Sequence, residues 1–334
     1  MNFENVEKDS SLEVRKTNSA MKMAGLFFFL VMLLEIPLSF VVSILGQIIP
    51  EEYSVLTSVL ITQGYLLGCA MIFALVTKQS WKNDLWMRKC KISSFFLSVL
   101  VLICATPMAT WLNMLSQLFA KNEISNAIYG ITKLIPVWLG VLIIGCLPAF
   151  VEEFLFRGII YSAFRKRSAL TAIVVSALTF GLMHMNFNQI MYAVYLGVLF
   201  ALVLEATGSL FSTMLLHMLF NATNTLYVYI LPRLYEFLGE HLTEYADMDL
   251  DTVMSSAVSK QEILSSLIMV TPTAFIGLFL AILLLRLIAK TNGRNLSWKY
   301  LCGNKEEVQM TQPVNLPLVL GCAFCLIIAI ANLV

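Results

Sequence analysis

The chain has 334 residues, of which 59% are hydrophobic and 13% are charged, with a formal net charge of +1. A soluble domain is about 45–50% apolar and about 25% charged, so this composition and the mean hydropathy of +0.81 exclude an ordinary soluble fold. No stripe of Lys and Arg with interleaved aromatics occurs, so we expect no nucleic-acid partner. The composition predicts an all-α, polytopic transmembrane helical bundle surrounded by membrane lipid.

The N-terminal segment, residues 1–23, is polar and of mixed charge, and we expect it to lie in the cytoplasm. The apolar run that follows is too long for the h-region of a signal peptide, so it is interpreted as an uncleaved first span. Residues 24–334 then form a single predicted transmembrane domain of eight or nine spans, each of about 19–29 residues and able to cross a hydrocarbon core of about 30 Å. The predicted spans are 24–48, 54–77, 92–119, 136–164, 168–186, 188–206, 209–231, 264–289 and 314–334. The sixth is the least hydrophobic of them.

The basic residues fall mainly in alternate loops, which supports this set of spans. If the N-terminus is cytoplasmic, seventeen Lys and Arg lie in segments predicted inside and four in segments predicted outside. The inside residues are Lys8, Arg15, Lys16, Lys22, Lys78, Lys82, Arg88, Lys89, Lys91, Arg165, Lys166, Arg167, Arg286, Lys290, Arg294, Lys299 and Lys305. The outside residues are Lys121, Lys133, Arg233 and Lys260. This bias follows the positive-inside rule and predicts a multi-pass protein of the cell membrane.

An acidic segment, residues 232–263, separates the seventh and eighth predicted spans. We expect it to form an extracytoplasmic loop with amphipathic helical character. Its acidic residues are Glu236, Glu240, Glu244, Asp247, Asp249, Asp251 and Glu262. Because the segment lacks the glycine and distal glutamate of an EF-hand, a solvated loop is favoured over a calcium site. The seven cysteines include no CxxC pair and are interpreted as small buried hydrophobic residues.

Ionisable side chains inside a bilayer are costly, so each is a functional candidate. Those within the predicted spans are Glu35, Glu152, Glu153, Arg157, His184, Glu205 and His217, joined by the amides of Asn221 and Asn224. For Glu35 a packing or snorkelling role is favoured, and for Glu205, near the end of its span, a position at the membrane interface. Most of the others lie within the predicted catalytic core, residues 136–231.

Two adjacent glutamates lie in the segment 148–158. On a helix, Glu153 and Arg157 are one turn apart and share a face, so they can form an ion pair. Glu152 is rotated by about 100° from Glu153 and lacks that counter-ion. A carboxylate without a counter-ion in a medium of low dielectric holds a proton readily, which suits a general base. The alternative is that both glutamates are structural and bond neighbouring helices.

Two further pairs occur at helical spacing. Phe180 and His184 are one turn apart, and so are His217 and Asn221. A single histidine of this kind often serves packing alone, and an intramembrane His or Asn often bonds two helices together. Taken together with the glutamates, however, the two imidazoles and the amide predict a polar site between helices.

A carboxylate, two imidazoles and an amide are the groups of a water-activating site. Counted from the basic turn 165–167, Glu153 and His184 lie at similar depth and His217 somewhat shallower. Two chemistries stay open. Glu152, His184 and His217 can hold a metal such as Zn²⁺ with an open position for water. Alternatively, the glutamate deprotonates water directly while a histidine and the asparagine stabilise the oxyanion. Either chemistry hydrolyses an acyl bond, and a peptide bond is the expected one.

The motifs Glu-Glu-x-x-x-Arg, Phe-x-x-x-His and His-x-x-x-Asn occur in this order at residues 152–157, 180–184 and 217–221. In this the chain resembles the CAAX protease and bacteriocin-processing family, also called the Abi or CPBP family, of intramembrane endopeptidases. The resemblance implies the following roles: Glu152 activates the catalytic water, Glu153 and Arg157 form a structural pair supported by Phe180, His184 and His217 bind water or a metal, and Asn221 stabilises the oxyanion.

Eukaryotic members of that family cleave the tail of prenylated CAAX proteins, and many bacterial members are linked to bacteriocin processing and self-immunity. The resemblance therefore implies a peptide hydrolase, of the metalloprotease type if zinc is bound, whose substrate is a lipid-anchored protein or a secreted peptide precursor. Two hypotheses from other classes stay open. One is a non-catalytic immunity or scaffolding protein that binds a peptide in the same cavity, and the other is a transporter that relays protons through Glu and His.

Overall fold

The computed structural model describes residues 3–241 and 259–333, and no strand occurs within these ranges. Each of the nine predicted spans coincides with a helix or a continuous run of helices. They are α1 (Phe3–Gly46), α2 (Ser54–Val76), α3 (Ile92–Gln117), the run Val137–Arg165, α8 (Ala169–Met183), α9 (Phe187–Thr207), α10 (Leu210–His241), α12 (Lys260–Thr291) and α15 (Leu316–Ala331). Seven of these are long and apolar enough to cross a membrane, whereas α8 and α15 are shorter, at 15 and 16 residues. The predicted polytopic helical bundle is confirmed.

Three helices extend beyond the predicted spans. Helix α1 runs without a break from Phe3, through the polar segment before residue 24. In the acidic segment 232–263, for which amphipathic helical character was predicted, α10 continues to His241 and α12 begins at Lys260. Apolar residues at 231, 234, 235 and 238 keep a helical spacing through the first acidic positions, and this extends α10. Glu244, Asp247, Asp249 and Asp251 lie outside the described residues.

Short helices connect the long ones. They are η1 (Glu51–Tyr53), α4 (Glu123–Thr132), α13 (Trp298–Cys302) and α14 (Lys305–Met310). All seven cysteines lie in the part of the chain that the structure describes and are free thiols; Cys325 is buried, as predicted for all of them, and the other six are partly buried.

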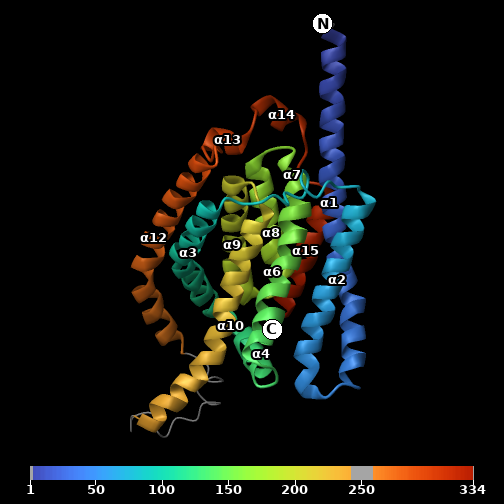
Figure 1. Cartoon of the computed structure of the whole chain (residues 1–334). Coiled ribbons are helices and arrows are strands. Elements are labelled where there is room, and N and C mark those ends of the chain that lie inside the picture. The colour runs from blue at the N-terminus through green and yellow to red at the C-terminus, as the bar shows by residue number, and fades with distance from the viewer. Residues whose placement is uncertain (1–2, 242–258, 334) are drawn as a thin grey trace.

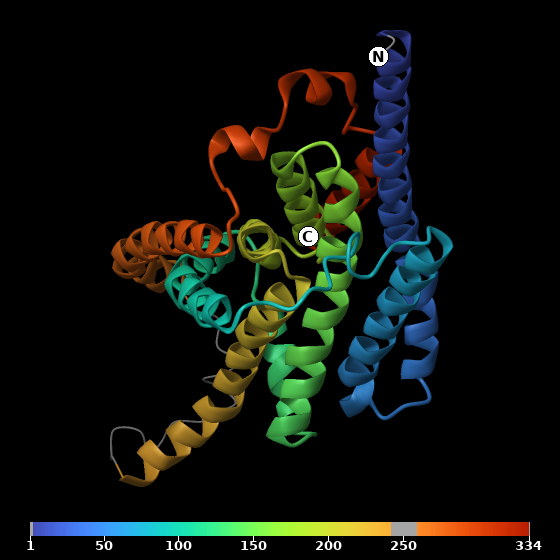
Figure 2. The same cartoon turned by 45° about the horizontal axis from the view of Figure 1, so that its top comes forward.

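The long helices surround one central helix, Val137–Arg165 (Figure 1). It is a continuous run of the elements α5 (Val137–Gly140), η2 (Val141–Cys146), α6 (Leu147–Glu153), η3 (Phe154–Tyr161) and α7 (Ser162–Arg165). Helices α2, α8 and α10 pack directly against it. The pair α3–α12 covers one flank and the pair α1–α15 lies toward the other, as Figure 2 shows from a second direction. Residues 151–164 of the central helix are buried as a result, whereas Trp138, Leu142 and Phe150 in its first half are exposed.

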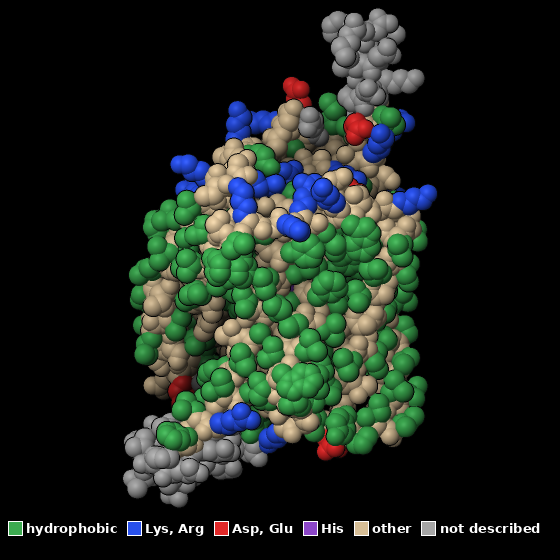
Figure 3. All heavy atoms as spheres, in the orientation of Figure 1, with side chains coloured by type: hydrophobic (Ala, Val, Ile, Leu, Met, Phe, Trp, Pro, Cys, Tyr) green, Lys and Arg blue, Asp and Glu red, His purple; other side chains and the backbone are tan. Residues whose placement is uncertain are grey.

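The outer surface carries a broad apolar band in the orientation of Figure 1 (Figure 3). Lys and Arg side chains gather at the end of the molecule where α7, α13 and α14 lie, above that band. Such a separation of apolar and basic surface is what a bilayer and its headgroup region favour. The one-sided basic end agrees with the loop-by-loop bias of the sequence.

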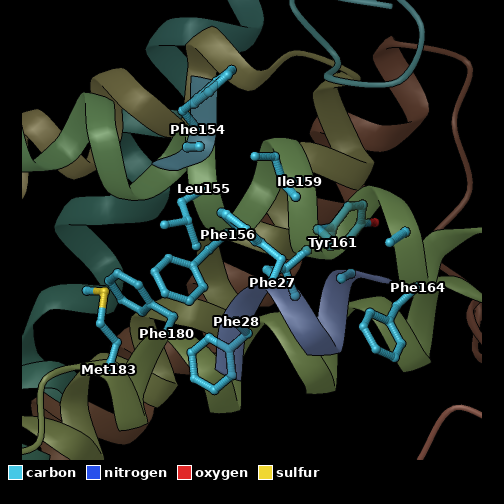
Figure 4. Packing of buried hydrophobic residues seen from close by; sticks show 14 of the residues in the cluster. Phe27, Phe28, Phe154, Leu155, Phe156, Ile159, Tyr161, Phe164, Phe180 and Met183 are labelled. Atoms are coloured by element: carbon cyan, nitrogen blue, oxygen red, sulfur yellow. The ribbon is translucent and has the colours of Figure 1, made fainter. Parts of the chain in front are cut away.

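Aromatic side chains hold α1 against the central helix (Figure 4). The ring of Phe28 lies 6.4 Å from that of Phe156, and the ring of Phe156 lies 5.4 Å from that of Phe180 on α8, both in edge-on arrangements. All three side chains are at most 2% exposed. Edge-on aromatic pairs add about 0.5–1.5 kcal/mol to the burial of their surface, so this row fixes three helices relative to one another.

The central helix is not a regular α-helix. Its segments η2 and η3 are π-helical and flank the seven residues of α6, about two turns, that carry the two glutamates. Pro148, at the start of α6, has no backbone N–H and cannot bond to the preceding turn, and a wider turn accommodates this. Because π-helical turns place successive side chains differently from α-helical ones, they set the directions of the residues that follow Glu153.

Helices α8 and α9 cross closely at two glycines. A Cβ added to Gly197 would lie 2.7 Å from the Cα of Ala177, and one added to Gly181 would lie 2.3 Å from the side chain of Val194. Small residues allow this approach, as they do in many membrane helix pairs. The crossing also brings the carbonyl of Gly197 to the central helix, where it accepts a hydrogen bond.

Glu205, near the end of α9, is enclosed by protein rather than exposed. Its side chain is fully buried and accepts hydrogen bonds from Tyr161 and from Arg165. Tyr300 of α13 donates to its other oxygen at 3.3 Å, and Arg294 lies 3.6 Å away. These five residues, which we call the Glu205 cluster, tie α9 and the central helix to the segment that follows α12.

Candidate active site

The two adjacent glutamates end α6 and are enclosed by neighbouring helices. Glu152 is 7% exposed and Glu153 is completely buried. Charged carboxylates at such sites require partners, because an isolated buried charge is very costly. The partners of the two side chains differ, and this difference organises the site.

Glu153 is bonded through one oxygen, Oε1, to two neighbours, Arg157 and His217. Its Oε1 accepts a hydrogen bond of 2.7 Å from Nη1 of Arg157, one turn later, which is the ion pair that the spacing predicted. Arg157 is fully buried, and its Nη2 donates to the carbonyl of Gly197 at 3.1 Å. Its guanidinium carbon also lies 4.4 Å from the ring centre of Phe180 and 5.4 Å from that of Phe200. The arginine is thus neutralised and held on several sides.

His217 of α10 lies between the two carboxylates. Its Nδ1 is 3.0 Å from Oε1 of Glu153, and its Nε2 is 3.8 Å from Oε2 of Glu152. Its ring stacks on Phe200 at 5.1 Å and meets Phe180 edge-on at 5.6 Å. The imidazole therefore links the two carboxylates.

Glu152 has only weak partners. Besides His217, it is approached by Gln63 of α2, whose Nε2 donates to Oε1 of Glu152 over 3.4 Å. Oε2 of Glu152 receives no hydrogen bond from a described residue. The non-equivalence that the helical spacing predicted is therefore present, with Glu153 paired and Glu152 free to bind a proton or water.

His184 and Asn221 make no hydrogen bond to either glutamate within the described residues. Nδ1 of His184 bonds the carbonyl of Phe180 at 2.9 Å, and the two rings of this pair meet edge-on at 5.2 Å. Because a carbonyl only accepts, Nδ1 carries the hydrogen, and Nε2 bonds no described residue. The Asn221 side chain is half-buried and makes no hydrogen bond within the described residues. Of the two predicted histidines, His217 is the one that contacts the carboxylates.

The predicted metal ligands do not form a cluster. Within the described residues, no group of three or more His, Cys, Asp or Glu side chains lies close enough together to hold a metal ion. Glu152 and His217 approach each other, but Nδ1 of His217 is engaged by Glu153 and His184 lies against Phe180. This arrangement does not fit a three-ligand site, so we derive no step through a metal.

Sequence reasoning missed Gln63. It considered ionisable groups and asparagines within the spans, and Gln63 is an uncharged amide in the second one. The available signal was that Gln63 is the single amide side chain in the predicted span 54–77. At 9% exposure it is the one α2 side chain that bonds a motif residue within the described structure.

The comparison with known families agrees with the geometry. The family described as type II CAAX prenyl endopeptidase Rce1-like matches residues 134–223, a stretch that includes all three motifs. No curated protein and no solved structure matches the chain significantly. The matched residues run from the start of the central helix to the part of α10 that carries His217. Over residues 134–223 the chain is therefore similar to the Rce1-like CAAX prenyl endopeptidases, a family of intramembrane proteases.

Proposed function

We propose that this chain is an intramembrane endopeptidase in which Glu152 activates water to hydrolyse a peptide bond of a membrane-associated peptide or protein. The observation that carries the proposal is the unequal pair of glutamates: Glu153 is neutralised by Arg157, while Glu152 keeps an unbonded oxygen beside His217. A structural pair would have no reason to leave one buried carboxylate without a strong donor.

The proposed reaction needs only the groups of this chain. Glu152 takes a proton from water while the water oxygen bonds the carbonyl carbon of the peptide, and the carbonyl oxygen becomes an oxyanion. The amide of Asn221, which is unbonded and one turn from His217, is the donor that we assign to the oxyanion. When the carbon–nitrogen bond breaks, Glu152 returns the proton to the leaving amine. His217 holds Glu152 in place, and His184 offers its free Nε2 as a further acceptor.

Two substrate classes follow from the family. One is the tail of a prenylated CAAX protein, which the matched family's description names, and the other is a bacteriocin or similar secreted peptide precursor. A quenched fluorescent farnesylated CAAX peptide and the same peptide without its lipid distinguish them. Cleavage of the farnesylated peptide alone supports the CAAX class, and equal cleavage of both supports a peptide precursor.

The test of the proposal does not require a known substrate. Cells that lack this chain are supplied with the wild type, with Glu152→Gln or with Glu52→Gln, an exposed control. Newly formed protein N-termini in their membranes and medium are then compared by mass spectrometry. We expect a set of cleavages in the wild type and the control that is absent with Glu152→Gln. Identical sets in all three would contradict the proposal and favour a non-catalytic binding protein.

Because the predicted ligands do not cluster, we expect hydrolysis to continue without a bound metal. Treatment of the purified protein in proteoliposomes with 1,10-phenanthroline should leave the cleavage rate within about twofold of the untreated rate. Elemental analysis of the same sample gives the zinc content. Loss of activity with the chelator and its return with Zn²⁺ would show that Glu152, His184 and His217 rearrange into a metal site.

A further inference from the structure

We propose that Gln63 of α2 is a positioning residue for the water that Glu152 activates. This deepens the proposed function and rests on it. In the proposed arrangement, the amide nitrogen of Gln63 holds one oxygen of Glu152, and the amide oxygen accepts the second hydrogen of the attacking water. Gln63 lies outside residues 134–223, so the matched domain would be completed by a helix that precedes it.

The orientation of the Gln63 amide is set by its partner. The carboxylate of Glu152, when ionised, only accepts hydrogen bonds, so the amide nitrogen must be the atom that faces it. The structure has Nε2 of Gln63 at 3.4 Å from Oε1 of Glu152, and α2 packs against both α6 and η3. Oε1 of Gln63 is consequently turned to the other side of the amide.

That amide oxygen is buried and has no partner. Within the described residues, five buried side-chain atoms lack a hydrogen bond, and three of them belong to this site: Oε1 of Gln63, Oε2 of Glu153 and Nε of Arg157. An unpaired buried polar atom costs about 1–3 kcal/mol, so native proteins generally supply a partner. A water molecule bonded to the Gln63 oxygen supplies it and stands beside Glu152.

Water activation itself calls for such an acceptor. A water molecule has two hydrogens, and the general base takes only one of them. If the other hydrogen bonds Oε1 of Gln63 while the first bonds Oε2 of Glu152, the lone pair that attacks the carbonyl carbon has a fixed direction. In the step, the O–H bond to Glu152 breaks, the new carbon–oxygen bond forms and the second O–H bond is kept. The proton then passes from Glu152 to the leaving nitrogen as the carbon–nitrogen bond breaks.

The experiment compares two variants of the full chain with the wild type in proteoliposomes. The probe is a quenched fluorescent peptide that spans a Glu152-dependent cleavage site from the membrane comparison. Gln63→Leu keeps the size of the side chain and removes both hydrogen bonds. Gln117→Leu is the matched control, because Gln117 is a half-buried glutamine of α3 whose Nε2 bonds Asn113 and contacts no residue of the site.

For Gln63→Leu we expect kcat to fall by about 10²-fold while KM changes by less than about threefold, since the water and not the peptide loses its contact. Gln117→Leu should keep both constants. A rise in KM with unchanged kcat, or no change at all, would overturn the proposal while leaving the proposed function intact. Absence of any Glu152-dependent cleavage would overturn both.

Discussion

Substituting the two adjacent glutamates by glutamine, one at a time, is expected to have different effects: one variant loses activity and the other loses stability. Glu152→Gln should fold normally and lose cleavage by about 10³-fold or more, because the base is gone while the amide keeps the size of the carboxylate. Glu153→Gln should instead lose about 3–5 kcal/mol of unfolding free energy, because Arg157 is then buried without its anion. Thermal unfolding in detergent measures the stability, and cleavage of a fluorescent peptide in proteoliposomes measures the activity.

The contrast follows from the contacts of the two side chains. Oε1 of Glu153 accepts from both Arg157 and His217, so a neutral amide there weakens two charged contacts at once. Glu152 loses only the 3.4 Å bond from Gln63 and the 3.8 Å approach of His217. Equal loss of stability in both variants would contradict the assignment of one structural and one reactive glutamate. So would a Glu152→Gln protein that cleaves at the wild-type rate.

A second pair of substitutions separates charge from packing at Glu153. Removing Arg157 and Glu153 together, as Glu153→Leu with Arg157→Leu, leaves no unpaired ion and should restore part of the stability that Glu153→Gln loses. It should not restore activity, since His217 then has no partner for Nδ1 and no longer holds Glu152. This variant therefore serves as the control for the stability measurement above.

The features that the sequence predicted well are those set by local spacing. The Glu153–Arg157 ion pair is one helical turn long, and any helix places those two side chains on one face. Likewise, the nine apolar runs can be recognised as spans from the thickness of a bilayer, and the alternating basic loops from the positive-inside rule. Local periodicity therefore fixed the fold class, the central helix and the unequal glutamates.

The features that were missed depend on contacts between distant segments. Gln63 reaches Glu152 across 89 residues of chain, and no spacing rule links the two. The spacing also left open which histidine contacts the carboxylates, and the packing of α10 on the central helix brings His217 to both of them. The partners of Glu205 were not foreseen, because Arg294 and Tyr300 lie about 90 residues farther along the chain.

The Glu205 cluster links the matched domain to the rest of the chain. Glu205 lies within residues 134–223, whereas Arg294 and Tyr300 belong to the segment after α12. Arg165 also donates to the hydroxyl of Tyr300, and its guanidinium carbon lies 5.5 Å from the ring centre of that tyrosine. The end of the central helix is thus bonded to the segment that follows α12. The stability of residues 134–223 therefore depends on Arg294 and Tyr300, which lie outside that stretch.

Glu205→Ala is accordingly expected to destabilise the protein by about 3 kcal/mol, because two arginines and the buried hydroxyl of Tyr161 lose their shared acceptor. The arginine side chains are 26% and 22% exposed, so water compensates part of the loss. Thermal unfolding measures the change. Limited proteolysis should show new cuts in residues 292–304, since the segment that carries Arg294 and Tyr300 is released.

Two variants control this experiment. Glu205→Gln keeps an oxygen that accepts from Tyr161 and should lose less stability than the alanine variant, while Glu306→Gln changes an exposed glutamate of α14 and should behave as the wild type. The folded fraction of Glu205→Ala should retain the wild-type kcat, because no residue of the Glu205 cluster bonds Glu152 or His217 within the described residues. A kcat that falls while the thermal stability is unchanged would instead place Glu205 in the reaction. Wild-type stability together with a wild-type proteolysis pattern would show that the Glu205 cluster does not hold the segment after α12.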